Sequence, residues 1–141
     1  MTQEQKELLL KDLCSRLPYR VKAYVKNWSK LDRKYYEGVY TVESIHPFLN
    51  NILVCSERFS VEVLVGHDDY EIKPYLFPLS SMTEEQKKEY HNLCSVGTDE
   101  CGDIIYFDTY ESIDYLNKNK FDYRYIIPMG LAEDATRLNI Y

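Results

Sequence analysis

The first residues of the chain place apolar and polar side chains in a pattern typical of an amphipathic helix. Thr2 and Gln5 have the spacing of a capping box, which predicts a helix that begins near Gln3. The apolar stripe that recurs at helical spacing consists of Leu10, Leu13, Cys14 and Leu17. Because Pro18 disfavours a helical backbone at the residue before it, we expect the helix to occupy residues 1–17.

Residues 18–78 have the alternation and the residue types of β-strands. From Arg20 to Lys26 the apolar side chains of one face alternate with those of a polar face, Arg20, Lys22, Tyr24 and Lys26. After a polar connection over 27–37, further β-rich runs occupy 38–45, 51–57, 59–65 and 70–75. Five short strands predict an SH3-like or OB-like small barrel, or a bent antiparallel sheet, and periodicity does not choose between them.

The pattern changes at Pro78, after which helical signals dominate. Overlapping capping boxes predict a helix from Thr83 to Cys94, followed by a polar loop over 95–102 and a short strand over 103–108. Thr109 then caps a helix that extends to about Lys120. We therefore expect one α+β domain over residues 1–141, with a helix (1–17), a barrel-like part (18–78) and a mainly helical C-terminal half (79–141).

Composition agrees with a single globular domain. The chain has 141 residues, of which 45% are hydrophobic and 28% charged, so it can bury a core without disulfides or metals. The first residues lack the basic start and apolar stretch of an export signal, and no apolar run approaches the ~18 residues of a membrane span. We expect a cytoplasmic protein whose four cysteines are reduced.

The candidate chemistry is weak. His91 and Cys94 share a helix face and Cys101 follows, but no C-x-x-C pair occurs and only His67 or Asp103 would offer a fourth ligand for zinc. Cys94 with His91 also lacks the turn of a catalytic nucleophile, and no Walker A, G-x-S-x-G, G-x-G-x-x-G or H-E-x-x-H motif occurs. We expect no metal, no cofactor and no catalytic residue, and a small cysteine- or metal-dependent enzyme is the least favoured alternative.

Charge is distributed unevenly. Residues 1–36 hold nine Lys and Arg against four Asp and Glu, although the whole chain has a net charge of −6. Aromatic residues lie among these cations, and phosphate contacts together with base stacking need that combination. The candidate binding residues are Arg20, Lys22, Tyr24, Lys26, Trp28, Lys30, Arg33 and Lys34. The alternative is a basic face that balances acidic parts of the same molecule.

Three segments resemble a group of small proteins common in gut Bacteroidales genomes and in their phages and prophages. They are LPYRVK (17–22), KPYLFPLSSMTEEQKKEY (73–90) and DYLNKNKFDYRYIIPMGLAEDATRLNIY (114–141). The resemblance implies a phage or prophage accessory context and transfers no catalytic residue. We therefore expect a non-enzymatic accessory protein that binds a host or phage protein. The alternative is a nucleic-acid-binding module that uses the basic, aromatic barrel face.

Overall fold

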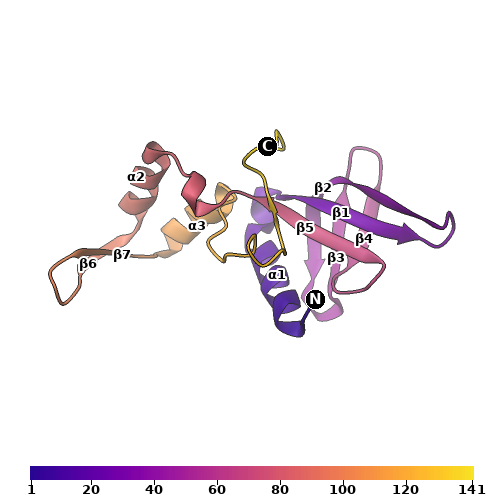
Figure 1. Ribbon diagram of the computed structural model, residues 1–141, viewed down its shortest axis with the longest axis horizontal. Coiled ribbons are helices and arrows are strands. Elements are labelled where there is room, and N and C mark those ends of the chain that lie inside the picture. The colour runs from indigo at the N-terminus through magenta and orange to yellow at the C-terminus, as the bar shows by residue number, and fades with distance from the viewer.

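A six-stranded sheet and a smaller helical part lie side by side along the long axis of the molecule (Figure 1). The computed structural model describes all 141 residues. Helix α1 (Gln3–Arg16) packs against the sheet, whereas α2, α3 and a two-stranded ribbon extend from one end. The α+β class expected from the sequence is confirmed.

The N-terminal helix forms where the sequence predicts it. Thr2 and Gln5 make both hydrogen bonds of the capping box at the start of α1. A short 3₁₀ turn (Leu17–Tyr19) follows, with Pro18 at its first positions. Arg20 then adopts a left-handed backbone, with φ +51°, and ends this turn. Arg20 is therefore not the first residue of the strand, contrary to the sequence prediction.

The sheet is mixed, and it is not closed into a barrel. Its strands follow the spatial order β4-β3-β2-β1-β5-β8. Their bounds are Lys22–Ser29 (β1), Lys34–His46 (β2), Asn51–Cys55 (β3), Ser60–Leu64 (β4), Tyr70–Leu76 (β5) and Glu133–Asp134 (β8). Neighbouring strands are antiparallel except β5 and β8. Closure would need β4 to hydrogen-bond with β5, but β5 pairs with β1 and β8 instead, so the SH3-like or OB-like barrel is not confirmed.

The expected polar connection over 27–37 is wrong. Strands β1 and β2 continue through it as a hairpin, in which Trp28 pairs with Tyr35 and Ser29 with Lys34. The high density of charge in this segment suggests a loop. Aromatic residues favour strands, however, and the cross-strand contact of Trp28 with Tyr35 stabilises the hairpin.

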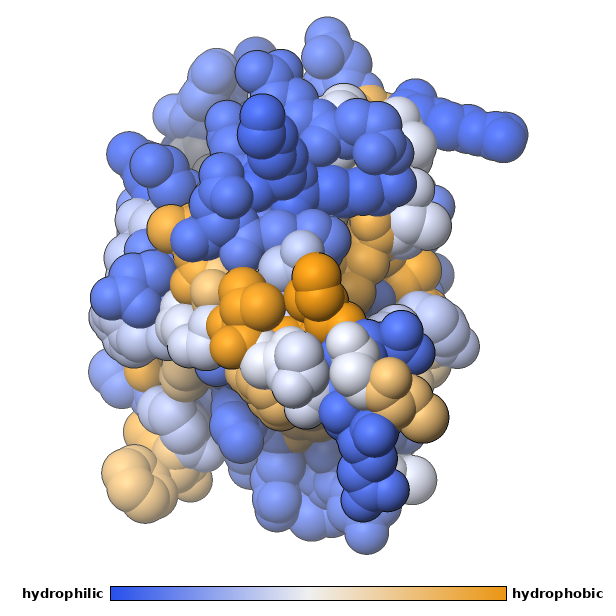
Figure 2. Space-filling model, turned by 90° about the vertical axis from the view of Figure 1, so that its left-hand side faces the viewer, coloured by the Kyte–Doolittle hydropathy of each residue, from blue (hydrophilic) through white to orange (hydrophobic).

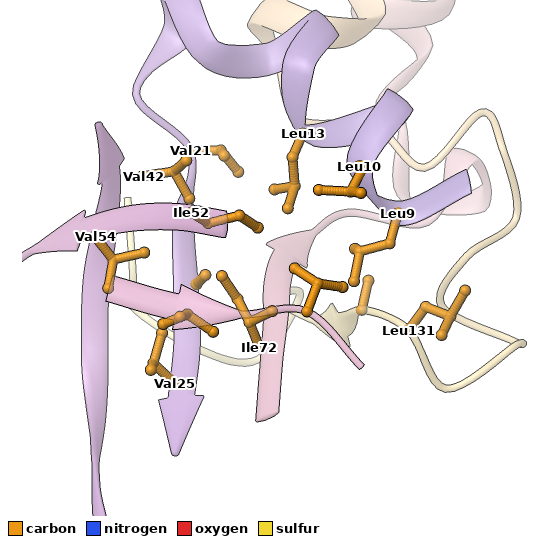
Figure 3. Packing of buried hydrophobic residues seen from close by; sticks show 14 of the residues in the cluster. Leu9, Leu10, Leu13, Val21, Val25, Val42, Ile52, Val54, Ile72 and Leu131 are labelled. Atoms are coloured by element: carbon orange, nitrogen blue, oxygen red, sulfur yellow. The ribbon is translucent and has the colours of Figure 1, made fainter. Parts of the chain in front are cut away.

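The main core lies between α1 and one face of the sheet. The side chains of Leu9, Leu10 and Leu13 point from α1 toward the strands (Figure 3). The residues that meet them are Val21, which directly precedes β1, and strand residues that include Val25, Val42, Ile52, Val54 and Ile72. Leu131, from the segment before β8, closes the same cluster. This cluster contains 17 buried residues, so it is large enough to order the whole sheet.

The helical part follows a 3₁₀ turn (Leu79–Ser81) and contains α2 (Glu84–Leu93), β6 (Ser95–Thr98), β7 (Ile104–Phe107) and α3 (Tyr110–Lys118). Both helices begin with a capping box, at Thr83, where the sequence predicts one, and at Thr109, where the sequence predicts an N-cap. The strand expected over 103–108 is confirmed as β7. The polar loop expected over 95–102 is wrong, because its first residues form β6. The last 23 residues contain only the two-residue strand β8, so a mainly helical C-terminal half is not confirmed.

A buried charged cluster joins α1 to the segment after α3. Arg16 and Asp12 are both fully buried and make an ion pair of 2.7 Å. Arg16 also donates to the backbone oxygen of Phe121 at 2.9 Å, and Arg124 donates to Asp12 at 3.1 Å. These contacts fix the C-terminal segment against the helix.

Candidate binding surfaces at the two ends of the molecule

The β1–β2 hairpin extends beyond the rest of the sheet as an arm, here called the basic arm (residues 26–36). The pairing of β1 with β5 ends at Asn27, and β2 pairs with β3 only from Thr41 onward. Beyond Trp28, whose N–H donates to the backbone oxygen of Asp69 at 2.8 Å, the strands of the arm therefore pair only with each other. Figure 1 shows the arm at the end of the molecule opposite to the ribbon.

The structure brings most of the predicted binding residues together in this arm. Lys26 and Trp28 lie on β1, Lys30 and Arg33 lie in the turn, and Lys34 begins β2. Lys22 and Tyr24 share the outer face of β1 but lie closer to its other end. Arg20 precedes the strand, at the far end from the turn. The site predicted from the sequence is thus divided between the two ends of β1.

Aromatic rings support the cations of the basic arm. The Nζ of Lys26 lies 4.6 Å from the ring centre of Tyr35, and the Nζ of Lys34 lies 4.7 Å from that of Tyr36. The rings of Trp28 and Tyr35 are 4.9 Å apart. Cation–π contacts of this kind are worth about 0.5–1 kcal/mol at exposed sites, so they orient the lysines without neutralising them.

The outer face of the sheet carries both signs of charge. Lys26 lies directly opposite Glu37 on β2 and Glu71 on β5. Lys73 makes ion pairs of 2.9 Å with Glu71 and 3.2 Å with Glu133. Positive charge on this face is therefore balanced within the molecule, as the alternative interpretation expects.

Tyr24 belongs to the same balanced face. Its hydroxyl donates to Glu37 at 2.7 Å, and this hydrogen bond is the main reason that the pKa of Tyr24 is raised to about 12. Its ring is thus held by an acidic neighbour. This contact leaves Tyr24 less free to stack on a ligand than the sequence pattern suggests.

At the tip of the basic arm, positive charge is no longer balanced by neighbouring acidic residues. Lys30, Arg33 and Lys34 are exposed, and none of them makes an ion pair. The one acid of the tip, Asp32, accepts hydrogen bonds from Tyr36 and Ser29, which lower the pKa of Asp32. A compact excess of positive charge therefore faces solvent here.

The opposite end of the molecule carries the β6–β7 ribbon, one side of which presents exposed apolar side chains. Val96 pairs with Tyr106 and Thr98 with Ile104, so these four residues share one side, here called the ribbon face. Val96 is 64% exposed and Ile104 65%. Figure 2, which views the molecule from this end, shows hydrophobic residues gathered in the middle of a hydrophilic surround.

Two aromatic contacts hold the ribbon in shape. His91 of α2 stacks on Tyr106, with ring centres 4.1 Å apart and planes inclined by 8°. On the other side of the ribbon, the ring of Phe107 covers Gly97 so closely that a Cβ there would lie 2.8 Å from the ring. Gly97 is therefore required for this packing, and the ribbon presents a defined surface although only two strands form it.

The surroundings of the ribbon face are strongly acidic. Residues 95–117 contain six Asp and Glu and no Lys or Arg. Asp99 orders the turn by accepting hydrogen bonds from the backbone of Cys101 and Asp103, at 2.9 and 2.8 Å. The side chains of Glu100, Asp103 and Glu111 make no hydrogen bond or ion pair within the molecule. These three carboxylates are free to meet a basic partner.

Asp108 has an internal role at the base of the ribbon. It accepts hydrogen bonds from the hydroxyls of Tyr90, at 2.6 Å, and Ser112, at 3.0 Å. Burial is the main cause that raises the pKa of Tyr90, and the hydrogen bond to Asp108 raises this pKa further. Through Asp108, the hydroxyl of Tyr90 therefore ties α2 to the start of α3.

His91, Cys94 and Cys101 do not assemble into a site. His91 lies against Tyr106, Cys101 is exposed in the ribbon turn, and no group of three His, Cys, Asp or Glu side chains has a metal-binding arrangement. Two grooves, of about 550 and 380 Å³, lie beside β5 and beside α3, and neither His91 nor Cys94 lines them. These three residues are therefore not gathered around either of the two grooves.

Sequence reasoning predicted the strand that forms β7 but missed β6, and with it the ribbon. The polar residues between Ser95 and Gly102 look like a loop, and only four residues of each strand are present to show alternation. The signal that would have found β6 is its position just before an acidic turn and the predicted strand over 103–108, because a chain that turns there can pair back on Ser95–Thr98.

Comparisons with protein-family models, with curated proteins and with solved structures found no match for this chain. None of its helices combines the length and the apolar character that crossing a membrane would require.

Proposed function

We propose that this chain is a non-catalytic protein-binding module that docks a basic, apolar segment of a partner on its β6–β7 ribbon. The observation that carries the proposal is the ribbon face itself, an exposed row of apolar side chains within a segment that has six acids and no base. Following the resemblance to phage and prophage proteins, the proposed partner is a host or phage protein.

The apolar side chains supply affinity. Ile104 and Val96 are largely exposed, and full burial of such a side chain is worth about 1.5–3 kcal/mol. Tyr106 lies between them, already fixed by its stack on His91, so a partner would order it at small entropic cost. Pre-ordered aromatic residues of this kind are typical interface hot spots.

The backbone of the ribbon supplies a second means of recognition. Strands β6 and β7 pair only with each other, so both outer edges have unpaired N–H and C=O groups. An extended peptide can add to such an edge as a further strand, which provides main-chain hydrogen bonds. The apolar face then selects alternate side chains of the added strand.

The carboxylates supply selectivity. Glu100 and Asp103 lie at the ribbon turn and Glu111 at the start of α3, all without internal partners. Charges at the rim of an interface mainly raise the association rate and reject partners of like charge. A partner segment with Lys or Arg beside its apolar residues would therefore be preferred over an acidic or neutral one.

The test is a selection of peptides from a random display library on the intact protein, followed by measurement of how the selected peptides bind an Ile104→Asp variant. We expect selected peptides to combine Lys or Arg with apolar residues, and to bind Ile104→Asp at least about tenfold more weakly, which is ~1.4 kcal/mol. A Phe48→Asp variant is the matched control, because Phe48 is a fully exposed apolar residue on the turn between β2 and β3. Equal binding to all three proteins, or peptides without basic residues, would contradict the proposal.

A second candidate function, nucleic-acid binding, is favoured by the tip of the basic arm. Lys30, Arg33 and Lys34 are unpaired cations beside Trp28 and Tyr35, the combination that contacts phosphates and stacks on bases. Single-stranded DNA or RNA would then bind with an affinity that falls steeply between about 50 and 200 mM salt. A Lys30→Glu/Lys34→Glu variant should lose this binding, whereas the control Lys11→Glu/Arg58→Glu, with the same change in charge, should keep it. Absence of binding by the unmodified protein at low salt would eliminate this function.

A further inference from the structure

The two ends of the molecule are complementary to each other. The tip of the basic arm carries three unpaired cations, and the ribbon end carries three unpaired carboxylates. We propose that the basic arm of one copy docks on the ribbon face of the next copy, in a head-to-tail contact. This inference rests on the proposed function, because it uses the same ribbon and names a second copy of the chain as its partner.

The positions of the two surfaces require separate copies. The arm and the ribbon extend from opposite ends of the long axis, with the sheet and α1 between them (Figure 1). One molecule therefore cannot bring its own arm to its own ribbon. Because the two surfaces differ, the contact is heterologous, and it leads to open chains or rings and not to a two-fold dimer.

Charges of opposite sign occupy corresponding places at the two hairpin tips. Lys30 and Arg33 lie in the turn of the arm, whereas Glu100 and Asp103 lie in the turn of the ribbon. The whole chain is acidic, with a net charge of −6, so two copies repel each other in most orientations. The basic tip of the arm is an exception to this repulsion, and it directs approach toward the acidic end of another copy.

Apolar side chains are exposed on both surfaces. Leu31, at the tip of the arm, is 93% exposed, and Tyr35 and Tyr36 are also exposed. The ribbon face offers Val96 and Ile104. Contact between the two sets would remove from water apolar surface that neither end covers within its own molecule.

Both surfaces also have free strand edges. On its β3 side, β2 has no partner from Lys34 to Tyr40, and β6 and β7 each have one free edge. Two hairpins with exposed edges can join into a four-stranded sheet between copies. The four-residue strands of the ribbon fit within the free length of β2, so the pairing needs no rearrangement of either hairpin.

Sedimentation velocity of two variants with one altered end each tests the contact. The arm variant is Lys30→Gln/Leu31→Ser/Lys34→Gln, and the ribbon variant is Glu100→Gln/Asp103→Asn/Ile104→Ser. At low salt the unmodified protein should form species that grow with concentration, and each variant alone should remain monomeric. An equimolar mixture of the two should form one-to-one dimers and nothing larger, because only one intact arm and one intact ribbon remain.

Matched controls change the same kinds of residue elsewhere. Lys11→Gln/Leu49→Ser/Arg58→Gln corresponds to the arm variant, and Phe48→Ser/Glu57→Gln/Glu62→Gln corresponds to the ribbon variant. Both controls should associate as the unmodified protein does. Raising the salt from about 0.05 to about 0.5 M, which shortens the screening length several-fold, should weaken the association at least about tenfold.

A monomeric unmodified protein up to about 1 mM, the weak end of specific association, would overturn the head-to-tail contact. Association that persists in either variant alone would do so as well. Neither result touches the peptide selection, in which basic peptides can still bind the ribbon. Loss of specific peptides in that experiment would instead contradict the proposed function.

Discussion

The sheet with α1 and the ribbon with α2 and α3 have the same kinds of element but differ in how much they bury. The cluster between α1 and the sheet has 17 buried residues, whereas the helical part has three, Met82, Leu116 and Phe121. A sheet covered by a helix hides one face of every strand. A two-stranded ribbon with helices at one side cannot do this, and such hairpins are only marginally stable alone.

The comparison shows that exposure depends on neighbours more than on residue type. Ile52 and Ile104 are both isoleucines on strands of antiparallel pairs, but Ile52 is fully buried and Ile104 is 65% exposed. The first lies under α1, and the second has nothing above it. Stability is therefore concentrated in the sheet part, and the surface available for binding is concentrated in the ribbon.

The largest effect is expected for Asp12→Ala, which removes the partner of a fully buried guanidinium group. Asp12 accepts two hydrogen bonds from Arg16, at 2.7 and 3.0 Å, and one from Arg124, at 3.1 Å. Because an unpaired buried charge is left behind, we expect the free energy of unfolding to fall by about 3–5 kcal/mol, measured by urea denaturation.

A double variant separates the cost of the unpaired charge from the cost of lost packing. In Asp12→Leu/Arg16→Met both charges are replaced by apolar side chains, so most of the stability should return. A double variant as unstable as Asp12→Ala would show that the unpaired charge is not the cause.

The next largest effects are expected for substitutions in the two hydrophobic clusters, and they differ in how much of the protein they destabilise. Leu13→Ala should lower the stability of the whole protein by about 2–5 kcal/mol, because Leu13 lies in the large cluster. Leu116→Ala in the small cluster should instead speed hydrogen exchange of the backbone amides in α2, β6, β7 and α3 while β1 to β3 stay protected. Equal acceleration throughout the chain would show that the two parts unfold as one unit.

A smaller effect, dependent on pH, is expected for Tyr141→Phe. The hydroxyl of Tyr141 donates to the backbone oxygen of Tyr75 at 2.9 Å and accepts from the backbone N–H of Lys22 at 3.0 Å. Loss of the donated bond should cost about 0.5–1.5 kcal/mol at neutral pH, measured by urea denaturation.

The pH dependence of this effect follows from the titration of the same hydroxyl. Burial raises the pKa of Tyr141 from 10.0 to about 12. Its contribution to stability is therefore complete below pH 10 and is lost as the pH rises toward 12. The difference in stability between the unmodified protein and Tyr141→Phe should shrink over that range, and a constant difference would show that the hydroxyl does not titrate as assigned.

The smallest effect on stability is expected on the ribbon face. Val96→Thr and Ile104→Thr should each change the free energy of unfolding by less than about 0.5 kcal/mol, because both side chains are already largely in water. Ile52→Thr, which makes the same change under α1, should cost several times more, as measured by thermal unfolding. A large loss for Ile104→Thr would mean that the ribbon face is part of the protein's own core.

Local signals in the sequence are sufficient for the elements whose stability is local. The capping boxes at Thr2, Thr83 and Thr109 each begin a helix, because their hydrogen bonds join residues three apart. The alternation of Val21, Ala23 and Val25 likewise places these residues in the core. The concentration of cations between Lys26 and Lys34 is also visible without a structure.

Pairing partners were not predictable in the same way. Whether β5 meets β4 or β8 depends on residues about 60 positions further along the chain, and the two residues Glu133 and Asp134 show no strand pattern. Some basic residues lie beside acidic residues on the outer face of the sheet, whereas those at the tip of the arm make no ion pair. This difference depends on Glu37 and Glu71, which lie opposite Lys26 only because their strands pair with β1. The exposure of the apolar residues on the ribbon face also depends on which strands pair, because β6 and β7 pair only with each other.

The sequence by itself determined the α+β class, the starts of the three helices, the core face of the first strand and the position of the basic, aromatic segment. Each of these depends on residues a few positions apart. Only the tertiary structure decided that the sheet stays open, that the basic segment forms an arm, and that an acidic, apolar ribbon lies at the opposite end. These depend on contacts between residues distant in sequence, whose energies arise only once the chain has folded.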